Sequence, residues 1–125
     1  MKDYPAKYKE YVKLMQSLGN EIPETMQAFN QLHQVSTQDS ALSKKTKELI
    51  ALGIAICVRC DGCITFHVHD ALRAGANQAE IVETIGTAIM MGGGPSVIYG
   101  CEALEALQQF AVTEVVIKTP DTSAS

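Results

Sequence analysis

The sequence predicts an all-α fold, a single compact domain of about six helices. Apolar residues recur at three- and four-residue spacing, the period of an amphipathic helix, and no stretch of convincing length alternates as a strand does. Glycines, prolines and capping residues divide the chain into segments of helical length. Because 125 residues suffice for one core, we expect one domain over residues 1–117 and a disordered tail over residues 118–125.

The first two predicted helices cover residues 3–18 and about 23–35. The first has an apolar face, and the Gly19-Asn20 pair is expected to end it. Pro23 suits the first turn of the second helix, where its missing amide proton is not needed. A polar loop is expected over residues 36–40. The second helix is expected to turn one set of residues inward: Ile22, Met26, Phe29, Leu32 and His33.

Two central helices follow. Ser43 is a plausible N-cap for the third helix. Residues 49–58 are apolar on every side, which indicates a helix that is fully buried or shared with another subunit. A turn at Asp61 and Gly62 is expected to separate it from a fourth helix over about residues 63–74, which Gly75 would end.

The last two predicted helices are separated by a Gly-Gly-Gly-Pro run at residues 92–95. Asn77 and Glu80 resemble a capping box, which would open the fifth helix and carry it through Met91. The sixth helix is expected from about Ser96 to roughly residue 113 or 116.

Composition narrows the possible partners. Ten basic and fourteen acidic residues give a net charge of -4, with no basic cluster that could neutralise phosphates. The N-terminal residues lack the apolar stretch of a secretory signal, and the glycines at residues 92–94 interrupt the least charged region. We therefore expect a cytoplasmic protein with no nucleic-acid or membrane partner.

The residues most capable of chemistry lie in one central run. Cys60 and Cys63 are three positions apart, and His67 follows the second cysteine by four. The amides and dipole at a helix start favour the reactive thiolate, and a second thiol nearby can capture a sulfenic acid or a mixed disulfide. His67 falls on the same helical face as Cys63, where an imidazole can accept and return a proton.

Metal binding is the main alternative for this run. Cys57, Cys60, Cys63 and His67 would offer four zinc ligands at short spacing. Cys57, however, lies in an uninterrupted apolar segment, and the chain can build a core without metal, so we expect neither a metal nor another cofactor. The remaining cysteines, Cys57 and Cys101, are interpreted as small buried apolar residues, and His33, far away in sequence, as a residue without a role in the chemistry.

A longer pattern surrounds the cysteine pair: Glu48, eleven residues, Cys60-x-x-Cys63, three residues and His67. Together with its neighbours over about residues 25–112, this pattern resembles the signature of the AhpD-like, or carboxymuconolactone decarboxylase-like, superfamily. The cysteine pair resembles the alkylhydroperoxidase branch, since the decarboxylase branch generally lacks it. The resemblance implies an all-helical fold that assembles as a homo-oligomer, a trimer or a hexamer, with the hexamer favoured.

The resemblance also implies roles for single residues. Cys63 would attack a hydroperoxide and become the sulfenic acid, and Cys60 would close the disulfide. His67 and Glu48 would form the proton relay that activates the thiols. The implied activity is that of a thiol-dependent peroxidase or disulfide oxidoreductase, which needs no bound cofactor. A thioredoxin-like or dihydrolipoyl-type donor would restore the dithiol.

Glu48 is the member of this set that local spacing does not explain. It lies twelve residues before Cys60, about 18 Å along an ideal helix, so the chain must bend back or bring it in by tertiary or subunit packing. Without the resemblance, Glu48 would be interpreted as a solvated charge near a helix start. Two other functions stay open: a decarboxylase-type lyase that uses His67 and Glu48 for acid–base chemistry, and a non-catalytic oligomer that uses the cysteine pair as a redox switch.

Overall fold

The computed structural model describes residues 2–118, and for residues 113–118 only the helical backbone. Within this part all regular structure is α-helical, which confirms the all-α prediction. The predicted disorder of residues 118–125 falls outside the described residues, except that Lys118 ends the last helix. The six helices are α1 (Tyr4–Glu21), α2 (Pro23–Thr37), α3 (Lys44–Cys57), α4 (Asp61–Arg73), α5 (Gln78–Gly92) and α6 (Gly94–Lys118).

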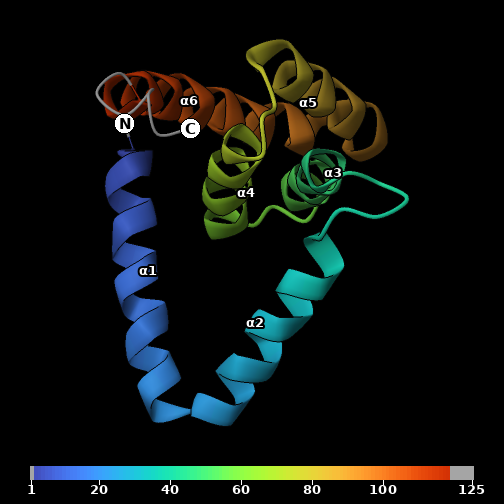
Figure 1. Ribbon diagram of the computed structural model, residues 1–125. Coiled ribbons are helices and arrows are strands. Elements are labelled where there is room, and N and C mark those ends of the chain that lie inside the picture. Colours follow the sequence, from blue (N-terminus) through green and yellow to red (C-terminus); the bar gives the residue numbers. More distant parts are fainter. Residues whose placement is uncertain (1, 119–125) are drawn as a thin grey trace.

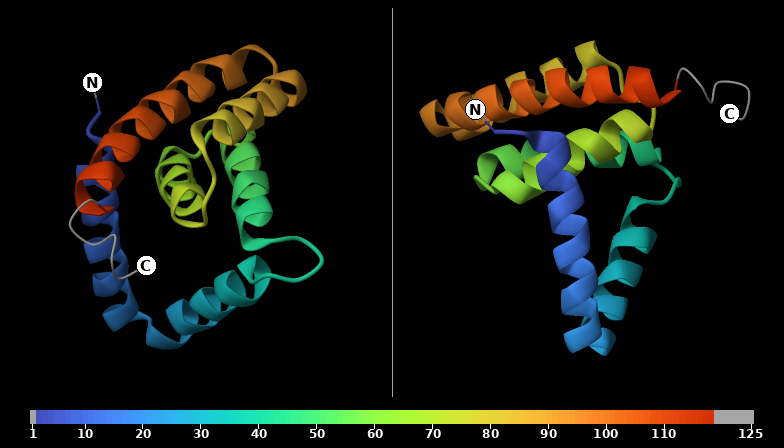
Figure 2. Two further views of the ribbon diagram at one scale, coloured as in Figure 1. Left: turned by 45° about the horizontal axis from the view of Figure 1, so that its top comes forward. Right: turned by 90° about the vertical axis from the view of Figure 1, so that its left-hand side faces the viewer.

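The helices form two parts, which we call the body (α3 to α6) and the arm (α1 and α2). In the body, α3 packs on α4 and α5, and α6 packs on α4 and α5. The arm is a V: α1 leaves the body, the chain turns at the tip, and α2 returns toward α3 (Figure 1). Seen from the side, the two arm helices extend away from the body together (Figure 2).

The hydrophobic core lies in the body around α4, with the start of α1 docked against it. Helix α4 occupies the middle of the molecule, and the other helices surround it (Figure 2, left). Tyr4 is the buried residue of α1, whereas α2 contributes none. The largest buried apolar side chains of the body are Leu52, Ile56, Ile64, Val68, Ile81, Leu107 and Phe110.

The predicted caps of α3 and α5 are confirmed. The Ser43 hydroxyl accepts the amide hydrogen of Thr46 at 3.1 Å. At the start of α5, the Asn77 side chain accepts the Glu80 amide, and the Glu80 carboxylate accepts the Asn77 amide, at 2.8 and 2.9 Å. Each pair satisfies donors that a helix start would otherwise leave unpaired, so the sequence was sufficient to locate both helix starts.

Three predicted boundaries were wrong by a few residues. Helix α1 continues past Gly19 to Glu21 and stops at Ile22, because the following Pro23 disfavours helical geometry in the residue before it. Helix α4 begins at Asp61 rather than at residue 63. The glycine-rich break is one residue long: Gly93, at a φ of 72°, separates α5 from α6.

The expectation that α2 turns its apolar face inward was confirmed only in part: Met26 and His33 are half-buried, but Ile22 is exposed. Phe29 and Leu32 are 53% and 60% exposed. The third helix is not fully buried within one chain either, since Ile50 and Ile54 are about half exposed. Of the two alternatives for the third helix, a face shared with another subunit stays open, and the V shape leaves α2 standing away from the body (Figure 1).

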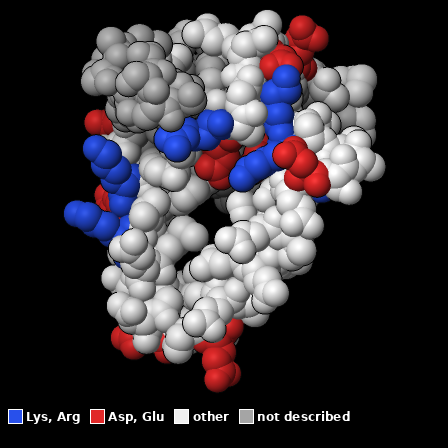
Figure 3. All heavy atoms as spheres, in the orientation of Figure 1, with Lys and Arg blue, Asp and Glu red and all other residues white. Residues whose placement is uncertain are grey.

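The surface carries both signs of charge. Basic and acidic side chains lie close together over the body, much of the arm is uncharged, and the face is hollowed between arm and body (Figure 3). None of the helices within residues 2–118 is long and apolar enough to cross a membrane.

Candidate active site

The cysteine pair lies at the start of α4, where the chain reverses direction. Cys60 is the N-cap residue, and its sulfur accepts the amide hydrogen of Cys63 at 3.2 Å. Cys60 and Cys63 are joined by a disulfide bond. The amides of the first helical turn therefore lie beside both sulfur atoms, in the environment that stabilises a thiolate once the pair is reduced.

A tight turn between α3 and α4 brings Glu48 to this site. Arg59 adopts a left-handed conformation, with a φ of 59°, and the Cys60 amide donates to the carbonyl of Ala55 at 3.1 Å. The two helices then pack along each other, and Glu48 on α3 meets His67 on α4. Tertiary packing within one chain thus brings Glu48 to His67, which the spacing along one helix does not do.

Glu48 and His67 form a hydrogen-bonded pair. The Glu48 Oε1 and His67 Nδ1 atoms are 2.9 Å apart. The Glu48 side chain is 1% exposed and that of His67 is 20% exposed. With Glu48 as a carboxylate, which only accepts hydrogen bonds, His67 donates through Nδ1 and its Nε2 atom is the one left to exchange a proton. The predicted relay residues are therefore in contact with each other.

A cavity of about 540 Å³ gives access to the disulfide. Its wall combines residues of the arm with residues of α4, so the arm completes a site whose reactive groups belong to the body. The aromatic and apolar part of the wall is extensive, and the polar groups are few. The lining residues are Tyr8, Tyr11, Met15, Phe29, Asn30, His33, Cys60, Gly62, Cys63, Phe66, His67 and Asp70.

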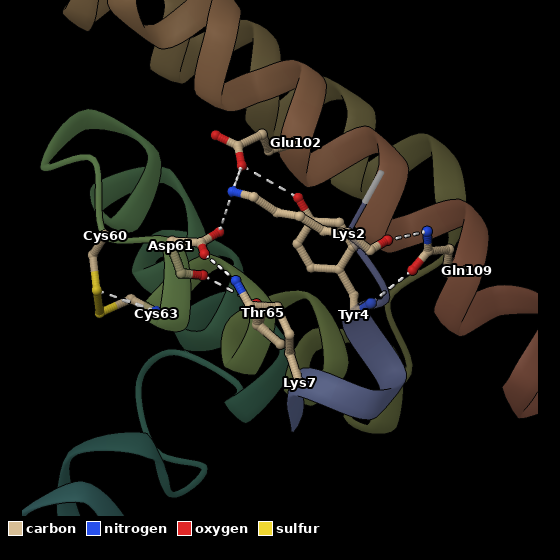
Figure 4. Close-up of polar contacts among 9 residues, drawn as sticks. All are labelled: Lys2, Tyr4, Lys7, Cys60, Asp61, Cys63, Thr65, Glu102 and Gln109. Atoms are coloured by element: carbon tan, nitrogen blue, oxygen red, sulfur yellow. Dashed lines mark hydrogen bonds and ion pairs between the residues drawn. A yellow bond between two sulfur atoms is a disulfide. The ribbon is translucent and has the colours of Figure 1, made fainter. Parts of the chain in front are cut away.

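An ion-pair cluster fixes α1 beside the cysteine pair (Figure 4). Asp61, the first residue of α4, pairs with Lys2 and with Lys7. Burial alone would raise the pKa of Asp61, but the hydrogen bonds from Lys7 and Lys2 outweigh it and hold the pKa below its usual value. Asp61 therefore stays charged, and the two ammonium groups offset a carboxylate that would otherwise oppose the neighbouring thiolate.

The same cluster continues to α6. Lys2 also pairs with Glu102, and this contact, more than any other, raises the pKa of Lys2. The buried Tyr4 donates its backbone amide to the Gln109 side chain at 2.8 Å. Burial is the main cause of a raised Tyr4 pKa, so its phenol stays protonated. These contacts attach the N-terminal segment to α4 and α6 in the way Figure 4 shows.

The other two cysteines are set apart from this site. The Cys57 thiol contacts the Ala88 carbonyl at 3.5 Å, and it lines a second, mostly apolar cavity between α3 and α5. Cys57 is therefore not gathered with Cys60, Cys63 and His67 into a four-ligand set. Cys101 is exposed, so its interpretation as a buried apolar residue was wrong.

His33 is the site residue that sequence reasoning missed. It lines the cavity from α2, and its ring lies 6.4 Å from that of His67 at an angle of 22°. One of its nitrogens lies within 4.8 Å of carboxylate oxygens of Glu48 and Asp70. A signal was present, because a titratable side chain on a face expected to point inward is unusual, but its distance in sequence from the cysteines concealed its partners.

Comparison with known proteins then assigns the family. The model of the carboxymuconolactone decarboxylase family matches residues 23–106. The chain belongs to this family. The match spans Glu48, Cys60, Cys63 and His67, so the resemblance inferred from their spacing is confirmed at the level of the family.

Relatives of the same family share most of the chain. A protein of Cupriavidus necator is 36% identical over 102 residues, covering 82% of this chain and 90% of its own. A carboxymuconolactone decarboxylase family protein of Legionella pneumophila is 43% identical, with a TM-score of 0.82 over 86% of this chain and 96% of its own.

A second similar structure comes from Thermotoga maritima. It is 26% identical and superposes with a TM-score of 0.78, covering 88% of this chain and 97% of its own. An involvement in antioxidative response has been suggested for that family member. These comparisons establish the fold and the family of the chain.

Proposed function

We propose that this family member is a thiol-dependent peroxidase, a disulfide oxidoreductase that reduces hydroperoxides through Cys60 and Cys63. The observation that carries the proposal is the disulfide at the start of α4, opening into a cavity beside the His67–Glu48 pair. A catalytic dithiol requires two cysteines that are close enough to bond. It also requires a helix N-terminus, which favours the thiolate, and a nearby imidazole, which carries the proton.

The oxidative steps balance with the groups at the site. The Cys63 thiolate attacks the hydroperoxide ROOH, the O–O bond breaks, and the products are Cys63–SOH and RO⁻. A proton converts RO⁻ to ROH. The Cys60 thiol then attacks the sulfenic sulfur, which forms the disulfide and releases water. Two electrons pass from the dithiol to the peroxide, and a dithiol donor returns them.

His67 and Glu48 supply the proton in this scheme. Because Nδ1 is engaged by Glu48, the Nε2 atom of His67 accepts the Cys63 proton and returns it to the leaving oxygen. The buried Glu48 side chain holds the ring in one orientation, and as a carboxylate it stabilises the protonated form of the ring. Cys63 is assigned the attack because it is the residue that shares a helical face with His67.

The donor is proposed to be a thioredoxin-like protein or a dihydrolipoyl group, because each presents two thiols that leave as a stable disulfide. Such donors fit a cytoplasmic location, where thiols are kept reduced. The exposed apolar residues of α2 and α3 support a homo-oligomer, with a hexamer favoured over a trimer, since contiguous exposed apolar surface marks a contact site.

Turnover of a hydroperoxide with a dithiol donor tests the proposal. Cys60→Ser and Cys63→Ser should each lose catalytic turnover, while Cys101→Ser, which changes an exposed thiol away from the site, should keep it. Mass spectrometry of oxidised protein should detect the Cys60–Cys63 disulfide in the wild type and in Cys101→Ser.

Other results would contradict the peroxidase. Lactone decarboxylation that is unchanged in both cysteine variants would identify a lyase that uses His67 and Glu48. A disulfide that forms once per chain, without turnover, would identify a redox switch.

A further inference from the structure

Each cycle of the proposed thiol–disulfide chemistry requires protons from bulk solvent. A dithiol donor attacks as the thiolate and leaves its two protons outside the cavity. Reduction of the disulfide then requires one proton for each of the two thiols, and His67 later transfers the Cys63 proton to RO⁻, which becomes ROH. The sum is donor dithiol plus ROOH giving donor disulfide, ROH and water. Two protons per cycle must therefore enter the site.

The Glu48–His67 pair is poorly placed to collect those protons by itself. Glu48 is 1% exposed, and the His67 atom facing it is engaged in their hydrogen bond. No second hydrogen bond to Glu48 comes from the residues that the structure describes. A buried carboxylate with one partner benefits from a further donor, and a water molecule could connect it to a polar group a few ångströms away.

His33 occupies that place. It is partly exposed, it lines the cavity from α2, and its ring faces the ring of His67. Its nitrogen lies within 4.8 Å of oxygens of both Glu48 and Asp70, a separation that one water molecule can bridge. An imidazole is the side chain that most readily gains and loses a proton near neutral pH.

We propose that His33 is the proton shuttle of this site, carrying protons between bulk solvent and the Glu48–His67 pair, with Asp70 orienting its ring. Asp70 is itself held by a hydrogen bond to His69 at 3.0 Å, and His69 stacks on Tyr8, so the orienting carboxylate is held through His69. The inference rests on the proposed thiol–disulfide cycle. It gives α2 a chemical role, because the arm then supplies the group that connects a buried relay to solvent.

Chemical rescue tests this role. The rate at which dithiothreitol reduces the Cys60–Cys63 disulfide is measured at low buffer concentration, with a chelator present because the same side chains could bind a metal ion. His33→Ala should slow this step roughly tenfold, and added imidazole should restore it by entering the space left by the side chain. Imidazole should not accelerate the wild type or Gln34→Ala, a change at the neighbouring exposed position of α2.

A second variant separates proton transfer from packing. His33→Gln keeps a polar side chain of similar length but cannot carry a proton, so it should be as slow as His33→Ala. A wild-type rate in His33→Gln, or a slow His33→Ala that imidazole does not restore, would overturn the shuttle.

The proposed function can fail separately from the shuttle. Absence of hydroperoxide turnover in the wild type would reject the peroxidase. The dithiothreitol step would still report on His33, because it needs only the disulfide and a dithiol.

Discussion

The body and the arm use their apolar residues differently. In the body, residues at helical spacing are buried against neighbouring helices of the same chain, as Ile64 is on α4. In the arm, residues at the same spacing, such as Leu32 on α2, stand exposed. The body therefore supplies stability and the reactive groups, whereas the arm forms one wall of the cavity and carries His33. An amphipathic pattern establishes that a face will be covered, but it does not identify what covers it.

The largest effect should come from the relay in the body. His67→Gln should reduce hydroperoxide turnover by about 10²- to 10⁴-fold, the usual contribution of a positioned general acid–base group. The measurement is kcat/KM with a saturating donor, and Arg73→Gln, at an exposed position of the same helix, serves as the control. Equal losses in the two variants would mean that the helix, rather than the proton carrier, was disturbed.

A paired substitution compares the two apolar faces directly. Ile64→Ala removes a fully buried side chain and should cost about 2–5 kcal/mol of unfolding free energy, whereas Leu32→Ala, in a dilute single-chain form, should stay within about 0.5 kcal/mol. Urea denaturation measures both. A concentration series then sharpens the comparison, because an effect of Leu32→Ala that grows with protein concentration would show that copies of the chain cover the arm.

The smallest effect concerns the contact that joins the two parts. Asp61 on α4 pairs with Lys7 on α1, and its pKa is below the ordinary value. A lowered pKa in the folded state adds stability above the unfolded-state value of about 3.9, and this contribution is lost as the pH falls through the folded-state pKa. Asp61→Asn should therefore lower the free energy of unfolding by about 1 kcal/mol or less at pH 7, because the ion pair is partly exposed. Below about pH 4 the difference between the two proteins should become progressively smaller.

Parallel urea titrations of wild type and Asp61→Asn, from pH 7 to below about pH 4, measure the difference in their free energies of unfolding. If the difference stayed constant into strong acid, the charge of Asp61 would not be its source, and the ionic contact between arm and body would have to be rejected.

Local features of the sequence were enough to predict most of the body. The capping residues Ser43 and Asn77 and the position of the cysteine pair near the start of a helix depend on neighbours within a few residues, and such patterns can be recognised directly. The meeting of Glu48 with His67 could not be derived in this way. It depends on the left-handed conformation of Arg59, which residues other than glycine rarely adopt. The spacing of residues in the sequence does not predict this conformation. Glu48 was selected by family resemblance instead.

The arm was harder to predict for a related reason. The start of α2 at Pro23 follows from proline chemistry, but the direction of its apolar face depends on the angle at which the chain leaves the turn at Ile22. That angle is set by tertiary packing. His33 was therefore assigned correctly to a helix but not to the site.

The N-cap of α4 is also one of the two redox atoms. The Cys60 sulfur accepts the Cys63 amide hydrogen in the disulfide form, and the strength of this hydrogen bond changes when the pair is reduced. The stability of the first turn of α4 and the reduction potential of the cysteine pair are thus linked in one thermodynamic cycle. An interaction that stabilises this turn more in the reduced protein than in the oxidised protein makes the disulfide a stronger oxidant by the same free energy.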